Sequence, residues 1–248
     1  MCRMLVALGE IPARILIDGM LPIAQDQTKI HEFNEKRGLE SWTHKDGWGI
    51  AYLRGKHWVI KKSVVPFFRD KRCLQKMRNI ETSALLLHVR KASGSRVALR
   101  NTHPFLLKKN KREYVFCHNG TIDDEIPHHT RFVAQGETDS ERLFYSILTA
   151  REKHSLLNAV RRNLRRYAEK WGTNVILSTK EKTYVGVGPS IFTKYYTMSL
   201  VQTPNFVIVS SEPLPRLKHL HWEKVHPGTI LEIDNKTREV KRYPIEKL

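Results

Sequence analysis

The chain has 248 residues, and its 40% hydrophobic content is enough to bury the core of one large domain or of two small ones. Charged residues interrupt the first twenty positions, and no run approaches the roughly 20 apolar residues of a membrane helix, so a secretory signal and a membrane span are excluded and a cytoplasmic protein is predicted. The 43 Lys and Arg against 25 Asp and Glu give a net charge of +18, which is high enough to raise nucleic acid or an acidic protein as a possible partner.

Strand signals are frequent along the chain, as short apolar runs rich in β-branched residues. In chain order they lie at residues 4–9, 49–54, 57–62, 83–90, 113–120, 174–179, 183–187, 205–211 and 229–234. The run at 83–90 is apolar enough to be buried on both faces. These runs predict substantial β-sheets.

Helical signals are fewer and lie near residues 24–36, 69–79, 139–150 and 152–171. The helix at 139 has a good start, since Thr138 and Asp139 can cap it. Within 151–170, arginines fall between apolar residues at helical spacing, which predicts an amphipathic helix with a basic face. This face is either simply solvated or a binding surface for RNA, DNA or a partner, and the lack of an aromatic-interleaved RNA motif favours the first interpretation.

Strands and helices do not alternate regularly along the chain, which argues against a doubly wound nucleotide fold. The sequence also lacks a G-x-x-x-x-G-K-[ST] motif and a G-x-G-x-x-G motif. No repeat and no linker rich in Gly, Ser or Pro divides it. The pattern therefore predicts one α+β domain in which sheets are packed by helices.

Cysteine is scarce, and the positions of Cys2, Cys73 and Cys117 argue against a disulfide framework and a zinc ribbon. Removal of the initiator methionine would make Cys2 the first residue. Its free α-amino group, with a pKa of about 7.7–8.0, would then lie close to the thiol and could accept its proton. While Met1 is attached, the Cys2 nitrogen is an amide and cannot act as a base.

Other polar residues stand where predicted strands end or a helix begins. Arg90 ends one strand, Asn119 and Gly120 end another, and Asp139 begins a helix. Such positions can converge on one pocket, so we expect these residues to form a site with Cys2. An Asn amide beside a Gly N–H suits an oxyanion, and an Arg fork suits a carboxylate. The simpler interpretations are a strand-end ion pair, a tight Asn-Gly turn and a helix cap.

Together these stretches resemble the class II (N-terminal nucleophile) glutamine amidotransferase family. That family has, in order, a Cys after the start Met, then H-x-R, N-x-H-P, H-N-G and T-D-[ST]-E. The same elements occur in this sequence at Cys2, 88–90, 101–104, 118–120 and 138–141. HKDGWGIAYL (44–53) and SSEPL (210–214) resemble a branch of stand-alone amidotransferase-like proteins that includes γ-glutamyl hydrolases.

The resemblance implies a four-layer α/β/β/α sandwich, the N-terminal nucleophile hydrolase fold, formed by residues 1–248 as a single domain. It implies that Cys2 is the nucleophile and that Asn119 and Gly120 form the oxyanion hole. Arg90 would bind the α-carboxylate of the substrate, and Asp139 its α-ammonium. The family chemistry requires no metal and no organic cofactor.

The resemblance implies cleavage of the γ-amide of glutamine or of a γ-glutamyl compound through a Cys2 thioester. Ammonia or an amine is released, and a separate ammonia-accepting subunit is one possible partner. Lys91 and Gly94 stand where the synthases have a Trp and a His that shape the glutamine pocket, and Arg3 replaces a Gly. The alternative is a catalytically inactive or regulatory domain that binds nucleic acid or an acidic partner through its basic surface.

Overall fold

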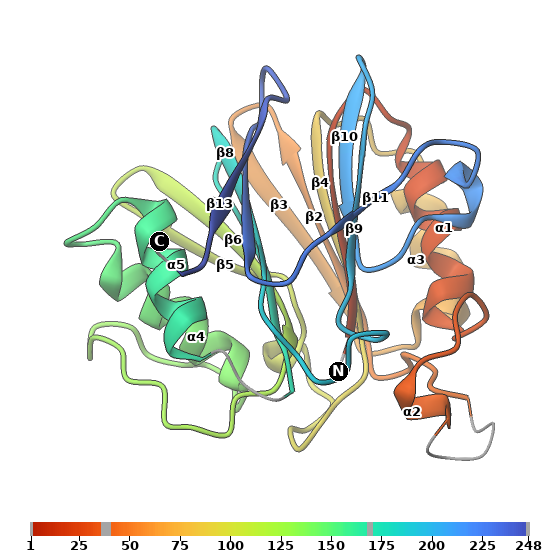
Figure 1. The fold of residues 1–248 in the computed structure, drawn as a ribbon. Helices are drawn as coiled ribbons and strands as arrows, with labels where there is room; N and C mark the ends of the chain where they lie inside the picture. The colour runs from red at the N-terminus through yellow and green to blue at the C-terminus, as the bar shows by residue number, and fades with distance from the viewer. Residues whose placement is uncertain (1, 36–40, 168–170, 247–248) are drawn as a thin grey trace.

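The computed structural model describes residues 2–35, 41–167 and 171–246, and their strands form two antiparallel sheets (Figure 1). The order in the first sheet is β11 (Glu223–Val225), β9 (Met198–Gln202), β10 (Phe206–Ser210), β1 (Cys2–Gly9), β4 (Ala84–Arg90), β2 (Trp48–Arg54) and β3 (His57–Ser63). The order in the second is β13 (Val240–Pro244), β12 (Thr229–Asp234), β8 (Lys182–Val187), β7 (Thr173–Ser178), β6 (Arg112–Gly120) and β5 (Phe105–Lys109).

Helices cover the outer face of each sheet (Figure 1). The helices are α1 (Ala13–Ala24), α2 (Glu32–Glu35), α3 (Lys71–Met77), α4 (Asp139–Ala150) and α5 (Leu156–Arg166), with short 3-10 turns at Phe67–Arg69, Leu99–Asn101 and Pro215–Leu217. α1 and α3 lie on the first sheet, and α4 and α5 lie on the second (Figure 1). The predicted α+β fold, a four-layer α/β/β/α sandwich, is confirmed.

The core follows from the two-residue period of the strands. In β1, Met4, Val6 and Leu8 point between the sheets, where Val115 and Cys117 of β6 meet them. The intervening residues of β1 point outward and pack against α1 and α3. β1 is therefore buried on both faces, which fixes its first residue, Cys2, at the end of the space between the sheets.

The nine predicted strands are confirmed with small shifts at their ends, whereas β5, β9, β11 and β13 were not predicted. The helix predicted near 24–36 is wrong, because α1 ends at Ala24 and only the four-residue α2 lies in that range. Gly19 and Pro22 obscured α1 in the sequence. Gly19 packs closely on Leu214, since a Cβ at this position would lie 3.2 Å from the Cβ of Leu214. Of the predicted helix 152–171, residues 156–166 are helical, and residues 168–170 lie outside the described part of the chain.

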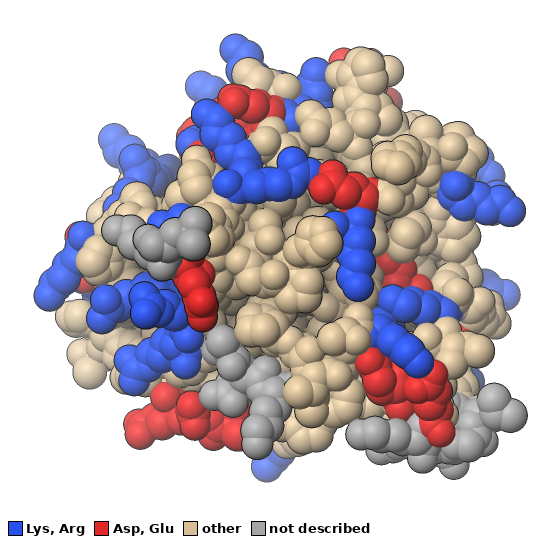
Figure 2. Space-filling model, viewed as in Figure 1, with Lys and Arg blue, Asp and Glu red and all other residues tan. Residues whose placement is uncertain are grey.

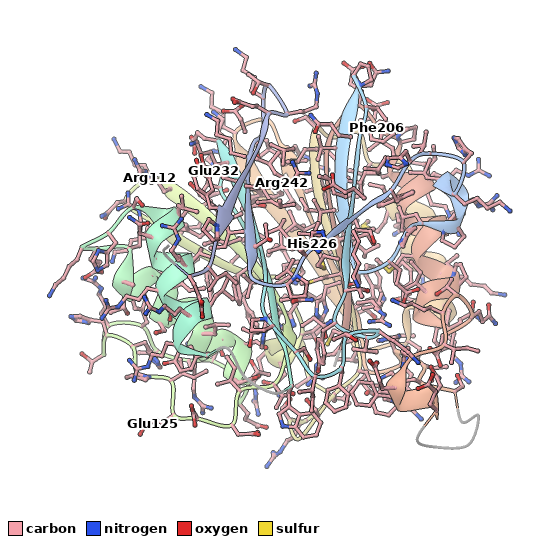
Figure 3. The ribbon with its side chains drawn as sticks, in the orientation of Figure 1. Arg112, Glu125, Phe206, His226, Glu232 and Arg242 are labelled. Atoms are coloured by element: carbon pink, nitrogen blue, oxygen red, sulfur yellow. The ribbon has the colours of Figure 1, made fainter. Side chains whose placement is uncertain are left out.

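One ion pair joins edge strands of the two sheets, and another lies within the second sheet. Arg242 of β13, labelled in Figure 3, pairs with Glu223 of β11 at 2.7 Å, and both side chains are about half exposed. Glu232 of β12 accepts a hydrogen bond from Nζ of Lys182 on the neighbouring β8, at 2.6 Å. No helix in the described segments is long and apolar enough to cross a membrane.

Candidate active site

Cys2 lies where strands of both sheets end. It is the first residue of β1, and the antiparallel register places it opposite Arg90, the last residue of β4. Its backbone nitrogen donates a hydrogen bond to Oδ1 of Asn119, at 2.8 Å, and Asn119 belongs to β6 of the other sheet. The fold therefore brings Cys2 together with Asn119 directly and with Arg90 through the ladder between β1 and β4.

The Cys2 thiol is buried, with 7% of the residue exposed, and its Sγ lies 3.8 Å from the carbonyl oxygen of Lys91. Burial alone would raise the pKa of this thiol. The positive charge at the N-terminus of the chain, followed by His88, outweighs burial and lowers the pKa of Cys2 to about 6. A lowered pKa raises the thiolate fraction, and the thiolate is the reactive form.

Alkylation of Cys2 by iodoacetamide is expected to accelerate as the pH rises through about 6 and then to level off, because the thiolate fraction follows the pKa. Cys73 provides an internal comparison. Burial and then the charge of Asp70 raise the pKa of Cys73, so it should react only in more alkaline solution. Peptide mass spectrometry of timed reactions would measure both, and identical pH profiles for the two cysteines would contradict the lowered pKa.

Asn119 is fully buried, and one of the two polar atoms of its side-chain amide has a hydrogen-bond partner. Oδ1 accepts from the Cys2 nitrogen, while Nδ2 has no hydrogen-bond partner within the described residues. Gly120 follows it, and a Cβ at Gly120 would collide with the carbonyl oxygen of Gly172. A donor without a partner therefore lies beside Cys2, next to a residue that has to be glycine for steric reasons.

Arg90 is 3% exposed, and the loop after β4 holds its guanidinium. Nη2 donates to Oγ of Ser95 at 2.8 Å, and Nη1 donates to the carbonyl oxygen of Arg96 at 3.2 Å. The backbone of Arg90 is also fixed, since its N–H donates to the carbonyl oxygen of Gly47 and its own carbonyl accepts from Asp46. The simple interpretation of Arg90 as half of a strand-end ion pair finds no support, because its side-chain partners among the described residues are a hydroxyl and carbonyl groups.

Asp139 begins α4, but the capping residue is Thr138, whose Oγ1 accepts from the backbone N–H of Glu141 at 3.2 Å. The Asp139 carboxylate instead accepts from the backbone N–H of Ile122 at 2.9 Å through Oδ2 and from that of Ser140 at 2.8 Å through Oδ1. It thus ties the segment just after Gly120 to the start of α4. No described hydrogen bond or ion pair joins Asp139 to Cys2, Arg90 or Asn119.

Two residues that the sequence did not assign to the site hold the Cys2 backbone. The Tyr195 hydroxyl donates to the Cys2 carbonyl oxygen at 3.3 Å and lies 3.0 Å from Nε2 of His44. Because a tyrosine has only one hydroxyl proton, His44 is the donor to Tyr195 in this arrangement. Burial lowers the pKa of His44 well below its usual value, which keeps the ring neutral. Cys2 is thereby fixed through both its nitrogen and its carbonyl oxygen.

Arg3 and Glu212 form an ion pair in the interior beneath Tyr195. Nη2 of Arg3 lies 2.9 Å from Oε1 of Glu212, and the two side chains are 1% and 5% exposed. Arg3 also donates to the carbonyl oxygen of Tyr195 at 2.8 Å, with its guanidinium 3.7 Å from the centre of the tyrosine ring. The sequence contained two signals for this pair: a charged residue next to a buried strand, and the acidic residue of SSEPL.

Two further histidines near the site, His118 and His103, are buried, and burial lowers the pKa of each. Nδ1 of His118 lies 2.9 Å from Oγ of Ser140, and burial lowers the pKa of His118 to about 4. Burial likewise lowers the pKa of His103 well below its usual value. No group of three or more His, Cys, Asp and Glu side chains in the described segments could hold a metal ion.

Comparison with known proteins finds related sequences over much of the chain. The family model described as "Glutamine amidotransferases class-II" matches residues 27–187. Two relatives carry the name "Putative glutamine amidotransferase". YafJ of Escherichia coli is 36% identical over 115 residues, 46% of this chain and 45% of YafJ, and the Haemophilus influenzae protein is 32% identical over 167 residues, 60% of this chain and 54% of its own. The chain thus spans about half the length of these relatives.

Solved structures show the same fold at low identity. The glutamine phosphoribosylpyrophosphate amidotransferase of B. subtilis superimposes with a TM-score of 0.73 and 18% identity, over 100% of this chain and 50% of that one. A predicted glutamine amidotransferase of Pseudomonas aeruginosa has a TM-score of 0.65 and 18% identity, over 96% of this chain and 99% of that one. Since the family model covers well over half of the chain and the fold agrees, the chain belongs to the class II glutamine amidotransferases.

Proposed function

We propose that the protein is an amidohydrolase that cleaves the γ-amide of glutamine or of a γ-glutamyl compound with Cys2 as the nucleophile. The observation that carries the proposal is the hydrogen bond from the Cys2 nitrogen to Oδ1 of Asn119, while Nδ2 of the same amide has no hydrogen-bond partner among the described residues. In this arrangement the nucleophile and an amide donor lie together, as acyl transfer requires.

In the proposed reaction, Sγ of Cys2 attacks the γ-carbonyl carbon of the substrate. Nδ2 of Asn119 and the N–H of Gly120 donate to the oxyanion that develops. With Met1 removed, the α-amino group takes the thiol proton and passes it to the leaving nitrogen, so ammonia or an amine departs and a γ-glutamyl thioester remains. Water then attacks the thioester, giving the carboxylate and restoring the thiol.

Substrate binding is assigned to two charged groups. The guanidinium of Arg90 would bind the α-carboxylate in a bidentate manner, exchanging its present carbonyl and hydroxyl partners for a charged one. The carboxylate of Asp139 would bind the α-ammonium. We further propose that residues 1–248 act as a single amidotransferase-like domain, with solvent or a separate subunit receiving the ammonia.

The proposal is tested by intact mass and by covalent labelling with a diazoketone analogue of glutamine. The expected result is a mass without Met1 and one label per chain, located on Cys2. The Cys73→Ser variant should be labelled to the same extent, because Cys73 is remote from the site and burial raises the pKa of its thiol. A chain that keeps Met1, or a label that is absent or on another residue, would falsify the proposal.

Asn119→Ala is expected to lower kcat by roughly 10²–10³-fold with a smaller change in KM, because an oxyanion donor acts mainly in the transition state. Asn119→Asp provides the matched variant, since it retains an acceptor for the Cys2 nitrogen and removes the donor. Steady-state ammonia release would measure both variants. If Asn119→Asp kept wild-type kcat, the role of Asn119 would be to anchor Cys2 and not to stabilise the oxyanion.

A further inference from the structure

The basic face of α5 borders a surface hollow of about 530 Å³ between the helix and the end of β13. Its lining residues are His154, Asn158, Arg161, Arg162, Arg165, Arg166 and Ile245. Figure 2 shows Lys and Arg side chains gathered over the position that α5 has in Figure 1. Neither Cys2 nor Asn119 lines this hollow, so it is distinct from the candidate active site.

The four arginines have no carboxylate partner within the described part of the chain. No ion pair there includes any of them, although exposed pairs occur elsewhere on the surface. Glu152, which lines the adjoining hollow, pairs with Arg131 and, at 3.0 Å, with Lys109, and no described ion pair joins it to the four arginines. Glu246, next to Ile245, is exposed and forms no ion pair in the described segments. Among the described residues, no ion pair therefore neutralises the positive charge around the hollow.

One of the arginines is held in place before any ligand binds. Nε of Arg161 donates to the carbonyl oxygen of Pro244 at 3.0 Å, and Nη1 donates to Oδ1 of Asn158 at 2.9 Å. Its guanidinium lies 5.9 Å from the centre of the Tyr243 ring. A guanidinium fixed by two hydrogen bonds loses less rotamer entropy when it binds an anion.

The four arginines form two pairs along the helix, each at a spacing that places like charges side by side. Arg165 follows Arg161 by four residues, and Arg166 follows Arg162 by four. Like charges at this spacing destabilise a helix. The opposite face of α5 is buried in the core. Leu164 packs so closely on Gly186 that a Cβ at Gly186 would collide with the Leu164 side chain. The repulsion on the outer face would be relieved by an anion that lies between the arginines.

We propose that this hollow binds a compact oligophosphate, a short chain of linked phosphates either free or attached to a nucleoside. Guanidinium groups bind phosphate oxygens in a bidentate geometry. Several arginines around one hollow therefore best match a ligand that carries several linked negative charges. The volume is within the usual range for small-molecule sites. No Phe, Tyr or Trp is among the lining residues, so apart from the His154 imidazole the hollow lacks the aromatic surface on which the bases of single-stranded nucleic acid stack.

Isothermal titration calorimetry with inorganic tripolyphosphate tests the proposal without depending on turnover or on Cys2. We expect saturable binding at one site, weaker at roughly 0.15 M salt than at low ionic strength because salt screens exposed charges. The variant R162E/R165E reverses two exposed lining charges and should bind at least about tenfold more weakly, a change of 1.4 kcal/mol or more. The variant K56E/K218E makes the same charge change at exposed positions away from the hollow and should bind as the wild type does.

Three results would overturn the proposal. One is no saturable binding of tripolyphosphate at low ionic strength. The second is an equal loss of affinity in the two variants, which would mean that only the overall charge attracts the anion. The third is binding of an RNA oligonucleotide that tripolyphosphate does not displace, which would assign the arginines to nucleic acid. Circular dichroism melting of both variants would confirm that they are folded, so a loss of binding can be attributed to the site.

Discussion

Cys2→Ala is expected to abolish amide cleavage and to leave the fold intact. The substitution removes the proposed nucleophile, and loss of such a group lowers kcat by on the order of 10⁴-fold or more. The backbone contacts of Cys2 to Asn119 and Tyr195 involve its nitrogen and carbonyl oxygen, which alanine retains. Ammonia release from glutamine and from a panel of γ-glutamyl compounds, compared with the wild type, would measure the effect.

Cys73→Ala is the matched control for this experiment. It removes a thiol of the same size from α3, where the residue is half-buried and burial raises its pKa. Activity should be unchanged in this variant. Turnover in Cys2→Ala comparable to that of Cys73→Ala would refute the assignment of the nucleophile, provided that both variants melt at similar temperatures.

Glu212→Ala is expected to lower the free energy of unfolding by about 3–5 kcal/mol, because it leaves the charge of Arg3 buried without its partner. Arg3 cannot avoid the penalty by losing its proton, since the guanidinium stays charged. The carbonyl oxygen of Tyr195 would remain as an acceptor but would not neutralise the charge. Urea unfolding followed by circular dichroism would measure the loss.

Glu223→Ala removes the carboxylate of an ion pair with similar geometry on the surface. Arg242 and Glu223 are 2.7 Å apart, and the two side chains are 49% and 52% exposed. Because solvent screens such a pair, we expect its loss to lower the unfolding free energy by about 0–1 kcal/mol. If Glu212→Ala and Glu223→Ala lowered the unfolding free energy by similar amounts, burial would not be what makes loss of the Arg3 pair costly.

The fold, and the proximity of Cys2 to Asn119 and Arg90, could be predicted from the sequence because their signals are local. A strand signal, a turn and a polar residue at its end lie within a few positions of one another, as in HVR and HNG. Cys2, Arg90 and Asn119 each stand at such a strand end, and the resemblance to a known family supplied the four-layer arrangement of sheets and helices. The structure then placed these residues together through the β1–β4 ladder and the facing strand β6.

The contacts of Tyr195 and His44 that support the Cys2 backbone could not be predicted, because these residues are distant from Cys2 in the sequence. Tyr195 meets Cys2 across 193 positions, and its own segment has no strand or helix signal. The helix α1 was missed for a different reason. Gly19 and Pro22 lower its helix propensity, whereas the close packing of Gly19 on Leu214 is a tertiary contact that single-sequence patterns do not register.

The two groups that would carry out the chemistry belong to opposite layers of the sandwich. Cys2 is at the end of one sheet and Asn119 at the end of the other, so their separation depends on how the sheets slide past each other. A displacement of about 1 Å in a reacting pair can lower a rate by about 10²-fold. The apolar layer between the sheets is therefore the alignment element of the site. A change in this layer that lets the sheets slide should lower activity, even at positions many residues from Cys2 or Asn119. The loss of activity should occur before the protein as a whole begins to unfold.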